Sequence, residues 1–407
     1  MSANFDILTQ RYVVQFECIA DRCEDDCCGG WTIPVKPSDE SRLLAALGPT
    51  KIVQHLVRTP NSASAPAEMK LCSNGQCSLQ GSDSLCQLHS KHGQQSLPDI
   101  CADYPRRLVQ VDNRLEITAA LSCPEVSRLV LFSEDALAFE HGDPSMLPRP
   151  KPAERLLTRS SSYYEPLNDV RSFLIQLLTL PHYTLKERLL MMAFFAKSTQ
   201  SFFHLEAEGN LGPPLLQSMQ NFSNSAFRAE LINAFSGEEI PSHLGMSLVE
   251  RVLHLSTSLR KQPKFTGLIA KAVTTYFDGD SPERPTRVVW EMYREREARM
   301  LDTFGDEFEL IFGNFAIHFV MHSAYTNSEN LLTYAILLLS QIAMQKFLLV
   351  SYPGADRDIE SLRKAAVEVI YQCQRTFLHA DILPHLYDDL KDNGYVTGAG
   401  AMLLTKF

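Results

Sequence analysis

Cysteine is the residue type in this sequence with the clearest chemical potential, and its placement is uneven. Nine of the ten cysteines lie within the first 123 residues, and only Cys373 lies beyond them. Thiolates are soft ligands that select zinc, copper(I) or iron–sulfur clusters. We therefore expect metal binding or catalysis in the first third of the chain, from Cys18, Cys23, Cys27, Cys28, Cys72, Cys77, Cys86, Cys101 and Cys123.

Disulfide bonding is a poor explanation for this cluster. The N-terminal string MSANFDILTQRYVVQF has no basic region, no long apolar core and no small-residue cleavage site, so we expect no signal peptide and a cytoplasmic location. Thiols stay reduced in that compartment. Cys27 and Cys28 are neighbours, and a disulfide between adjacent residues is strained.

The cysteine spacing does not by itself identify the metal. It matches neither the tandem C-x2-C pairs of zinc fingers nor the ferredoxin run C-x2-C-x2-C-x3-C. It also lacks the C-x3-C-x2-C run of radical S-adenosylmethionine enzymes, because Cys28 directly follows Cys27. A structural zinc site and an iron–sulfur cluster both remain open, although the number of thiols exceeds the need of one tetrahedral zinc ion.

Short elements are expected around the cysteines. Residues 38–48 predict a helix with Ser38 as N-cap and Gly48 at its end. A second helix should begin at Pro124, with Cys123 as N-cap and its thiolate favoured by the helix dipole. Partial apolar alternation over Arg107–Ala119 predicts a hairpin around Asp112–Asn113.

The sequence as a whole predicts a mainly α fold. We expect an irregular, cysteine-rich, metal-binding domain over residues 1–141, a linker over 142–165 and a larger α-helical domain over 166–407. Thr184–Glu187 has the form of a capping box at a helix start. Further helical patterns cover about 245–260, 285–303, 306–324, 329–352 and 356–380.

Three features of the helical part favour structural roles. Cys373 falls on the apolar face of the last pattern, so we expect a buried core thiol. His318 and His322 have helical i, i+4 spacing but lack the glutamate of the H-E-x-x-H zinc motif, and phenylalanines surround them. Leu331–Val350 is interrupted by polar residues, which favours a core helix over a membrane span.

The formal net charge of −10 argues against general nucleic-acid binding. It leaves room for a basic substrate, such as a lysine side chain on another protein. No Gly-x-Gly-x-x-Gly follows a predicted strand, so a Rossmann-type cofactor site is not supported.

Four strings of this sequence, taken in order over about residues 10–130, resemble the bacterial flagellin lysine-N-methylase family. They are Phe16–Trp31 (FECIADRCEDDCCGGW), Cys86–His89 (CQLH), Cys101–Arg106 (CADYPR) and Leu121–Glu125 (LSCPE). That family is related to the broader zinc- or iron-chelating CxxCxxCC domains.

The resemblance implies an S-adenosylmethionine-dependent methyltransferase that modifies ε-amines of surface lysines of flagellin. It also implies an iron–sulfur cluster, expected to be of the 4Fe-4S type. No insertion into membranes is expected, because polar residues interrupt Leu331–Val350. Cys72 departs from the family pattern and is interpreted as a spare thiol. The implied ligands come from Cys18, Cys23, Cys27, Cys28, Cys77, Cys86, Cys101 and Cys123.

Methyl transfer to lysine sets further requirements. The amine has a reference pKa near 10.4 and must lose its proton before it attacks. Glu24 and Asp25 could pair with the lysine or the sulfonium, although a solvated acidic turn would look the same. Asp103 and Tyr104, beside Cys101, could orient the amine. These four residues are the candidate catalytic groups.

Two residues are candidates for cofactor binding. Arg106 could bind the carboxylate of the methionine part of the cofactor, and Trp31 could offer its ring face to a cation. The alternatives are that Arg106 forms a surface salt bridge and that Trp31 is a core residue.

Two other function classes fit the same cysteines. One is a non-enzymatic zinc- or iron-binding protein or assembly factor with a cysteine-stapled domain. The other is a redox sensor that uses the vicinal thiols of Cys27 and Cys28.

Overall fold

A mixed β-sheet lies beside the helices and carries several of the candidate residues at its edge. The computed structural model describes residues 6–59, 62, 64–146, 148–149, 154–237, 245, 263–276, 285–379, 388, 391–392, 394 and 396–406. In it the five strands of this sheet have the order β7 (Phe139–His141), β1 (Asp6–Gln10), β6 (Arg114–Ala119), β5 (Arg106–Val111) and β8 (Glu154–Leu156).

The predicted hairpin is confirmed at the centre of this sheet. β5 and β6 pair antiparallel from Arg106 opposite Ala119 to Val111 opposite Arg114. Asp112 turns the chain with a positive φ of 51°, and its carboxylate accepts hydrogen bonds from Thr158. β1 runs parallel to β6 and leads directly into the short helix α1 (Arg11–Gln15).

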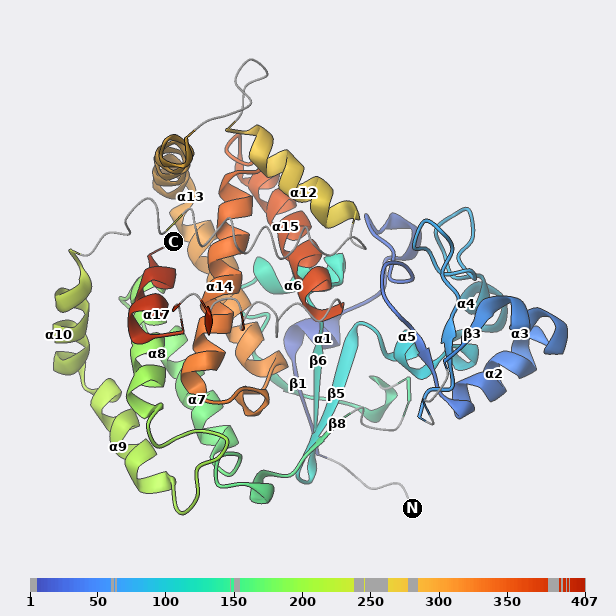
Figure 1. Cartoon of the computed structure of the whole chain (residues 1–407), viewed down its shortest axis with the longest axis horizontal. Coiled ribbons are helices and arrows are strands. Elements are labelled where there is room, and N and C mark those ends of the chain that lie inside the picture. Colours follow the sequence, from blue (N-terminus) through green and yellow to red (C-terminus); the bar gives the residue numbers. More distant parts are fainter. Residues whose placement is uncertain are drawn as a thin grey trace.

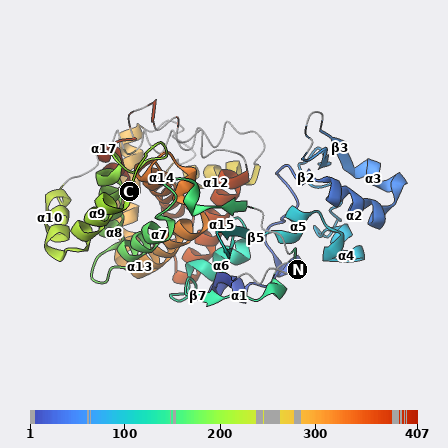
Figure 2. The ribbon, with the colours of Figure 1, turned by 90° about the horizontal axis from the view of Figure 1, so that it is seen from below.

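A small lobe stands to one side of the main body, as Figures 1 and 2 both show. Its buried residues run from Ile33 to Ala102 and form a hydrophobic cluster of their own. The lobe contains the strands β2 (Pro34–Val35), β3 (Leu56–Arg58) and β4 (Ala67–Met69), with β4 in the middle of the sheet, and the helices α2 (Pro37–Leu47), α3 (Pro49–His55), α4 (Gln87–His92) and α5 (Asp99–Asp103).

The first helix of the lobe begins earlier than the sequence predicted. Lys36, not Ser38, is the N-cap, and Pro37 takes the first helical position, which its fixed φ suits. The carboxylate of Asp39 accepts a hydrogen bond from the Lys36 N–H at 2.9 Å, so one exposed backbone donor is satisfied without a serine cap. The predicted end at Gly48 is confirmed, with a φ of 77°.

The main body is helical around one large hydrophobic cluster. Its helices are α6 (Pro124–Leu131), α7 (Leu167–Leu178), α8 (Leu185–Thr199), α9 (Gly212–Ser223), α10 (Ser225–Phe235), α12 (Pro263–Thr274), α13 (Thr286–His322), α14 (Leu331–Val350), α15 (Ile359–His379) and α17 (Gly398–Thr405). Short 3-10 turns lie at Ala20–Arg22, Gln94–Ser96, Pro144–Met146, Thr158–Ser160 and Tyr325–Asn327.

Most of the helical predictions are confirmed. Thr184 and Glu187 form the predicted capping box of α8. The two patterns predicted over 285–303 and 306–324 form one run, α13, with non-helical dihedrals at Phe304, where the predicted gap falls. The pattern at 245–260 lies outside the described residues, except for residue 245.

The helix α14 is long and strongly apolar. It is the one helix in the described part of the chain whose length and composition would suffice to cross a membrane, and 89% of its apolar window is buried inside the protein. This burial confirms the prediction of a core helix. Cys373, on the neighbouring α15, is fully buried, as predicted.

The mainly α fold class is confirmed, whereas a small irregular cysteine-rich domain is not. Residues of β1, β5, β6 and α6 share the large cluster with the helices, and β8, inside the predicted linker, is an edge strand of the same sheet. The physical reason is that the alternating apolar residues of the hairpin need a partner surface, which α13 supplies. The division at 141 and 166 stays a prediction, since the packing groups residues by core rather than by these positions.

Candidate functional site

The structure brings the eight candidate cysteines into two neighbouring groups where the small lobe meets the main body. We call residues 23–30, which join the two, the cysteine loop. The first group comprises Cys18, Cys23 and Cys123, whose thiols interact electrostatically. The second comprises Cys27, Cys28, Cys77, Cys86 and Cys101, linked in the same way.

Cys28 is the centre of the second group. Its Sγ lies 4.0 Å from the Sγ of Cys27, and it also hydrogen-bonds Cys86. Because Cys28 keeps its proton and donates it, its own pKa is raised and that of Cys27 is lowered. The hydrogen bond with Cys28, helped by the backbone N–H groups at the start of α4, lowers the pKa of Cys86 to about 6. Cys27, Cys28 and Cys86 thus influence one another's pKa through sulfur–sulfur hydrogen bonds.

Burial has the opposite effect on four other thiols, since it raises the pKa of Cys23, Cys77, Cys101 and Cys123. It raises the pKa of Cys123 to about 12, although Cys123 is the N-cap of α6, as predicted, and accepts hydrogen bonds from the N–H groups of Val126 and Glu125. The N–H groups at the start of α6 lower the pKa of Cys123, in the direction that the sequence predicted, but desolvation outweighs them.

The thiols are suitable metal ligands, but their side chains are not arranged around a common point. Within the described residues, no three His, Cys, Asp or Glu side chains are arranged so that they could hold a metal ion. The donor set itself suits a soft metal, since it consists of reduced cysteines that already contact one another. Cys72 is exposed, as Cys18 and Cys27 are, and it interacts electrostatically with Cys77, so its interpretation as a spare thiol stays a prediction.

The acidic residues of the cysteine loop are tied to the helical body. The Asp25 side chain is only 1% exposed and pairs with Arg375 of α15 at 2.8 Å and with Lys264 of α12. Glu24 pairs with Arg128 of α6 at 2.6 Å and remains 40% exposed. The alternative of a solvated acidic turn therefore does not hold for Asp25.

Arg375 also fixes the backbone of the loop. Its guanidinium donates to the carbonyl oxygen of Asp26 at 2.7 Å and to that of Gly29. On the other side of the turn, the Asp26 carboxylate accepts a hydrogen bond from the Cys28 N–H at 3.1 Å. Arg375, some 350 residues away in the sequence, therefore helps to fix the backbone on both sides of the Cys27–Cys28 pair.

The two aromatic candidates lie near the thiols and contact each other. The indole N–H of Trp31 donates to the carbonyl oxygen of Cys27 at 3.1 Å, and its ring centroid lies 6.5 Å from that of Tyr104. The Tyr104 hydroxyl is 3.2 Å from the hydroxyl of Ser122, and burial raises the pKa of Tyr104. Tyr104 interacts electrostatically with both Cys27 and Cys123, so it lies near both groups.

Asp103 and Arg106 are near each other and incompletely paired. Burial raises the pKa of Asp103 to about 6, and its Oδ1 has no hydrogen-bond partner among the described residues. The Nε of Arg106 is likewise without an acceptor there, and its guanidinium lies over the ring of Phe16 at 5.1 Å from the centroid. Unsatisfied buried polar atoms of this kind are costly unless a ligand completes them.

The two histidines of α13 have the structural role that the sequence favoured. His318 donates from Nε2 to the carbonyl oxygen of Ala119 at 2.8 Å, and His322 bonds the Thr118 hydroxyl at 2.9 Å. Both are buried, and burial lowers the pKa of His318 to about 4. They connect α13 to the end of β6.

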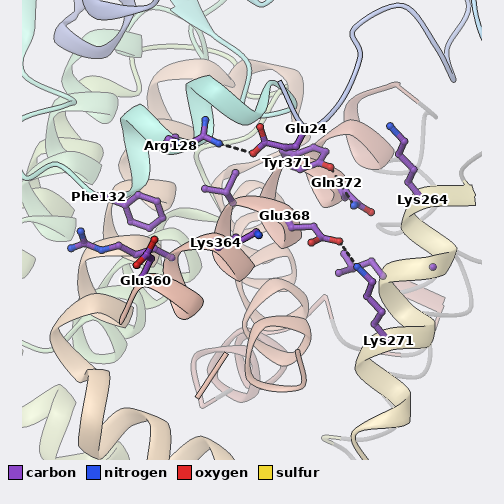
Figure 3. Close-up of a pocket in the computed structure, with 14 residues that line it drawn as sticks. Glu24, Arg128, Phe132, Lys264, Lys271, Glu360, Lys364, Glu368, Tyr371 and Gln372 are labelled. Atoms are coloured by element: carbon purple, nitrogen blue, oxygen red, sulfur yellow. Dashed lines mark hydrogen bonds and ion pairs between the residues drawn. The ribbon is translucent and has the colours of Figure 1, made fainter. Parts of the chain in front are cut away.

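A groove of about 800 Å³ adjoins the cysteine loop (Figure 3). Glu24 lies at its edge, α6 and α12 flank it, and α15 crosses it. Sequence reasoning missed this groove, together with Lys264 and Arg375, because no local motif marks them. Its lining is mixed, with apolar residues between charges: Glu24, Arg128, Phe132, Lys264, Gly267, Leu268, Lys271, Glu360, Arg363, Lys364, Val367, Glu368, Tyr371 and Gln372.

Comparison with known proteins identifies relatives of this chain. It is 30% identical to the flagellar biosynthetic protein FliU of Salmonella muenchen over 156 residues, which are 37% of this chain and 91% of that protein. It is 31% identical to a lysine-N-methylase of Salmonella typhimurium and 30% identical to one of Salmonella choleraesuis, each over 131 residues. Those alignments span 31% of this chain and only 33% of either enzyme. No solved structure matches.

The family model that matches covers the helical body. It describes the FliB lysine N-methylase C-terminal domain and matches residues 171–404, which include Lys264, Arg375 and the helices α12 and α15. The cysteine strings that carry the resemblance lie outside this range, so the two observations are independent. Together they show that the chain belongs to the FliB lysine N-methylase family.

Proposed function

We propose that this protein is an S-adenosylmethionine-dependent lysine N-methyltransferase that modifies ε-amines of surface lysines of flagellin in the cytoplasm. Membership of the lysine N-methylase family supports the reaction, and the name of the flagellar relative supports the substrate. The observation that carries the proposal is the junction at Asp25, where a buried carboxylate beside the cysteines already binds a lysine ammonium.

We propose that the cysteines hold an iron–sulfur cluster. The eight candidate thiols lie in two adjoining groups, and eight exceed the four ligands that one cluster needs. When bound, such a cluster supplies iron centres whose potential depends on hydrogen bonds to sulfur. The N–H groups around Cys86 and Cys123 are donors of that kind.

The chain's own residues would bind and orient the reactants. The Asp25 and Glu24 carboxylates would attract the target ammonium. Asp103, with a pKa of about 6, is largely ionised at neutral pH and would accept a proton from the amine. The Arg106 guanidinium would bind the carboxylate of S-adenosylmethionine, which would complete its unsatisfied Nε, and Trp31 and Tyr104 would exclude water.

The groove would guide the substrate protein to this site. The α15 residues that line it run from Glu360 to Gln372, a helix length of about 18 Å. An extended segment of five or six residues spans about the same distance. The groove ends at Glu24, next to Asp25, so a lysine carried by such a segment would arrive at the cysteine loop.

One observation favours a second candidate, a zinc-binding protein without methyl transfer. The Sγ atoms of Cys27 and Cys28 are 4.0 Å apart. Two thiolates on one tetrahedral zinc ion, with Zn–S bonds of about 2.3 Å, lie roughly 3.8 Å apart. A single-ion site that staples the loop would need little rearrangement there.

The test is methylation of flagellin. Anaerobically purified protein is incubated with flagellin and S-adenosylmethionine, and flagellin lysines are mapped by mass spectrometry. We expect methylated lysines with the wild type and with Cys72→Ser, and none with Cys28→Ser or Cys86→Ser. Flagellin that stays unmodified in the presence of the wild type would contradict the enzymatic proposal.

A further inference from the structure

Lys264 occupies a position that the proposed reaction assigns to a substrate. Its ammonium hydrogen-bonds the Asp25 carboxylate and lies 3.9 Å from Oδ2 of Asp26. Lys264 is the second residue of α12 and lines the groove, as Figure 3 shows. A lysine ε-amine of this chain therefore already sits on the carboxylate that is proposed to attract the target ammonium.

The carboxylate it contacts belongs to the site and is not a surface group. The Asp25 side chain is 1% exposed, and Arg375 holds its second oxygen at 2.8 Å. The Asp25 N–H donates to the sulfur of Cys23, so the same residue touches both the lysine and the first thiol group. Lys264 itself is 54% exposed, so its amine reaches both the buried carboxylate and solvent.

Lys271 is a natural comparison. It lies two turns further along α12, lines the same groove and is 52% exposed, close to the value for Lys264. Its ammonium pairs at 2.8 Å with Glu368 of α15, away from the cysteine loop. The two lysines share a helix, a similar exposure and a carboxylate partner, although Lys271 also contacts the hydroxyl and ring of Tyr352. They differ in whether the carboxylate they bind belongs to the proposed centre.

We propose that Lys264 occupies the acceptor-lysine position and is itself a methylation site when no protein substrate is bound. The inference rests on the proposed function. The ammonium first releases one proton to bulk water. The nitrogen lone pair then forms the N–C bond to the methyl carbon, and the S–C bond breaks with its electron pair moving to sulfur. The products are N-methyl-Lys264 and S-adenosylhomocysteine, with no net oxidation or reduction.

The test uses the complete, metal-loaded protein with methyl-labelled S-adenosylmethionine and no flagellin. Peptide mapping is expected to place the label on Lys264 and to leave Lys271 unlabelled. Lys264→Arg should abolish self-labelling. Lys51→Arg, which changes an exposed lysine of α3 far from the groove, should retain it.

A parallel reaction with flagellin distinguishes a failure of this inference from a failure of the proposed function. If flagellin is methylated while Lys264 stays unmodified over many turnovers without substrate, the inference is overturned and the proposed function stands. Equal labelling of Lys264 and Lys271 would also overturn it, because it would indicate unselective transfer to any groove lysine. If neither protein gains label, the proposed function fails and the inference fails with it.

Discussion

The guanidinium of Arg375, on α15, lies 2.8 Å from the buried carboxylate of Asp25 in the cysteine loop. This ion pair joins the helical region that identifies the family to the segment that carries the thiols. The same guanidinium donates to the carbonyl oxygens of Asp26 and Gly29, so it holds the backbone on both sides of the Cys27–Cys28 pair. Together with Lys264, which also pairs with Asp25, and Arg128, which pairs with Glu24, Arg375 connects the helical body to the proposed centre.

Replacement of Arg375 by leucine should destabilise the protein and loosen the loop. Breaking a buried ion pair leaves an incompletely compensated charge, and we expect the free energy of unfolding to fall by about 3 kcal/mol in urea titrations. Alkylation of Cys27 and Cys28 in the metal-free protein should become faster. Arg287→Gln, which breaks an exposed pair with Glu291, is the control and should change neither quantity appreciably. Equal behaviour of the two variants would contradict the role given to Arg375.

Asp103 should give the reaction a pH dependence. Burial raises its pKa to about 6, so the carboxylate becomes able to accept a proton as the pH rises through that value. We expect kcat/KM for flagellin to rise with pH through an inflection near 6, and Asp103→Asn to lower kcat and remove that inflection. An unchanged profile in Asp103→Asn would show that another group accepts the proton.

The raised pKa of Asp103 should also make the stability of the protein depend on pH. Between about pH 4 and pH 6 the folded protein keeps a proton on Asp103 that the unfolded chain has released. The free energy of unfolding should therefore fall as the pH rises through this window, and the contribution should vanish in Asp103→Asn. Urea titrations at several pH values measure it.

The buried histidines His318 and His322 should make the protein less stable as the pH falls, which is opposite to the effect of Asp103. Burial lowers the pKa of His318 to about 4 and that of His322 as well, so the unfolded chain binds protons that the folded chain does not. Stability should be lost as the pH falls below about 6.5, by about 3 kcal/mol for His318 alone. His318→Gln should flatten this acid limb, and His141→Gln, whose side chain is 90% exposed, should leave it unchanged.

A charged side chain in the groove should affect the KM for flagellin. Lys364 lines the groove without an ion pair among the described residues, so its ammonium is available to a substrate segment. Lys364→Glu should raise KM for flagellin about fivefold, with kcat little changed, because it reverses a charge that touches only the docked segment. Lys51→Glu on α3 is the charge-matched control. A fall in kcat at constant KM would place Lys364 in the chemistry rather than in docking.

Features that depend only on residues close together in the sequence could be predicted from it. The hairpin, the capping box of Thr184, the N-cap position of Cys123 and the burial of Cys373 all follow from turn chemistry or apolar periodicity within a few residues. The helix start at Lys36 was misplaced by two residues because a proline at the first helical position competes with a serine cap.

Long-range contacts could not be predicted in this way. β1 has little alternation of its own and forms because β6 and β7 pair with it on both sides. The contacts of Arg375 and Lys264 with Asp25 join residues more than 200 positions apart, and an arginine on a helix carries no signal for its partner. The sequence located the thiols, but the fold decides which of them meet.

The central claim is that the gathered thiols hold an iron–sulfur cluster, and metal analysis of anaerobically prepared protein tests it most directly. We expect iron and acid-labile sulfide in similar amounts, lost in Cys28→Ser and Cys86→Ser and retained in Cys72→Ser. Stoichiometric zinc without sulfide, or a protein that binds no metal under these conditions, would contradict it.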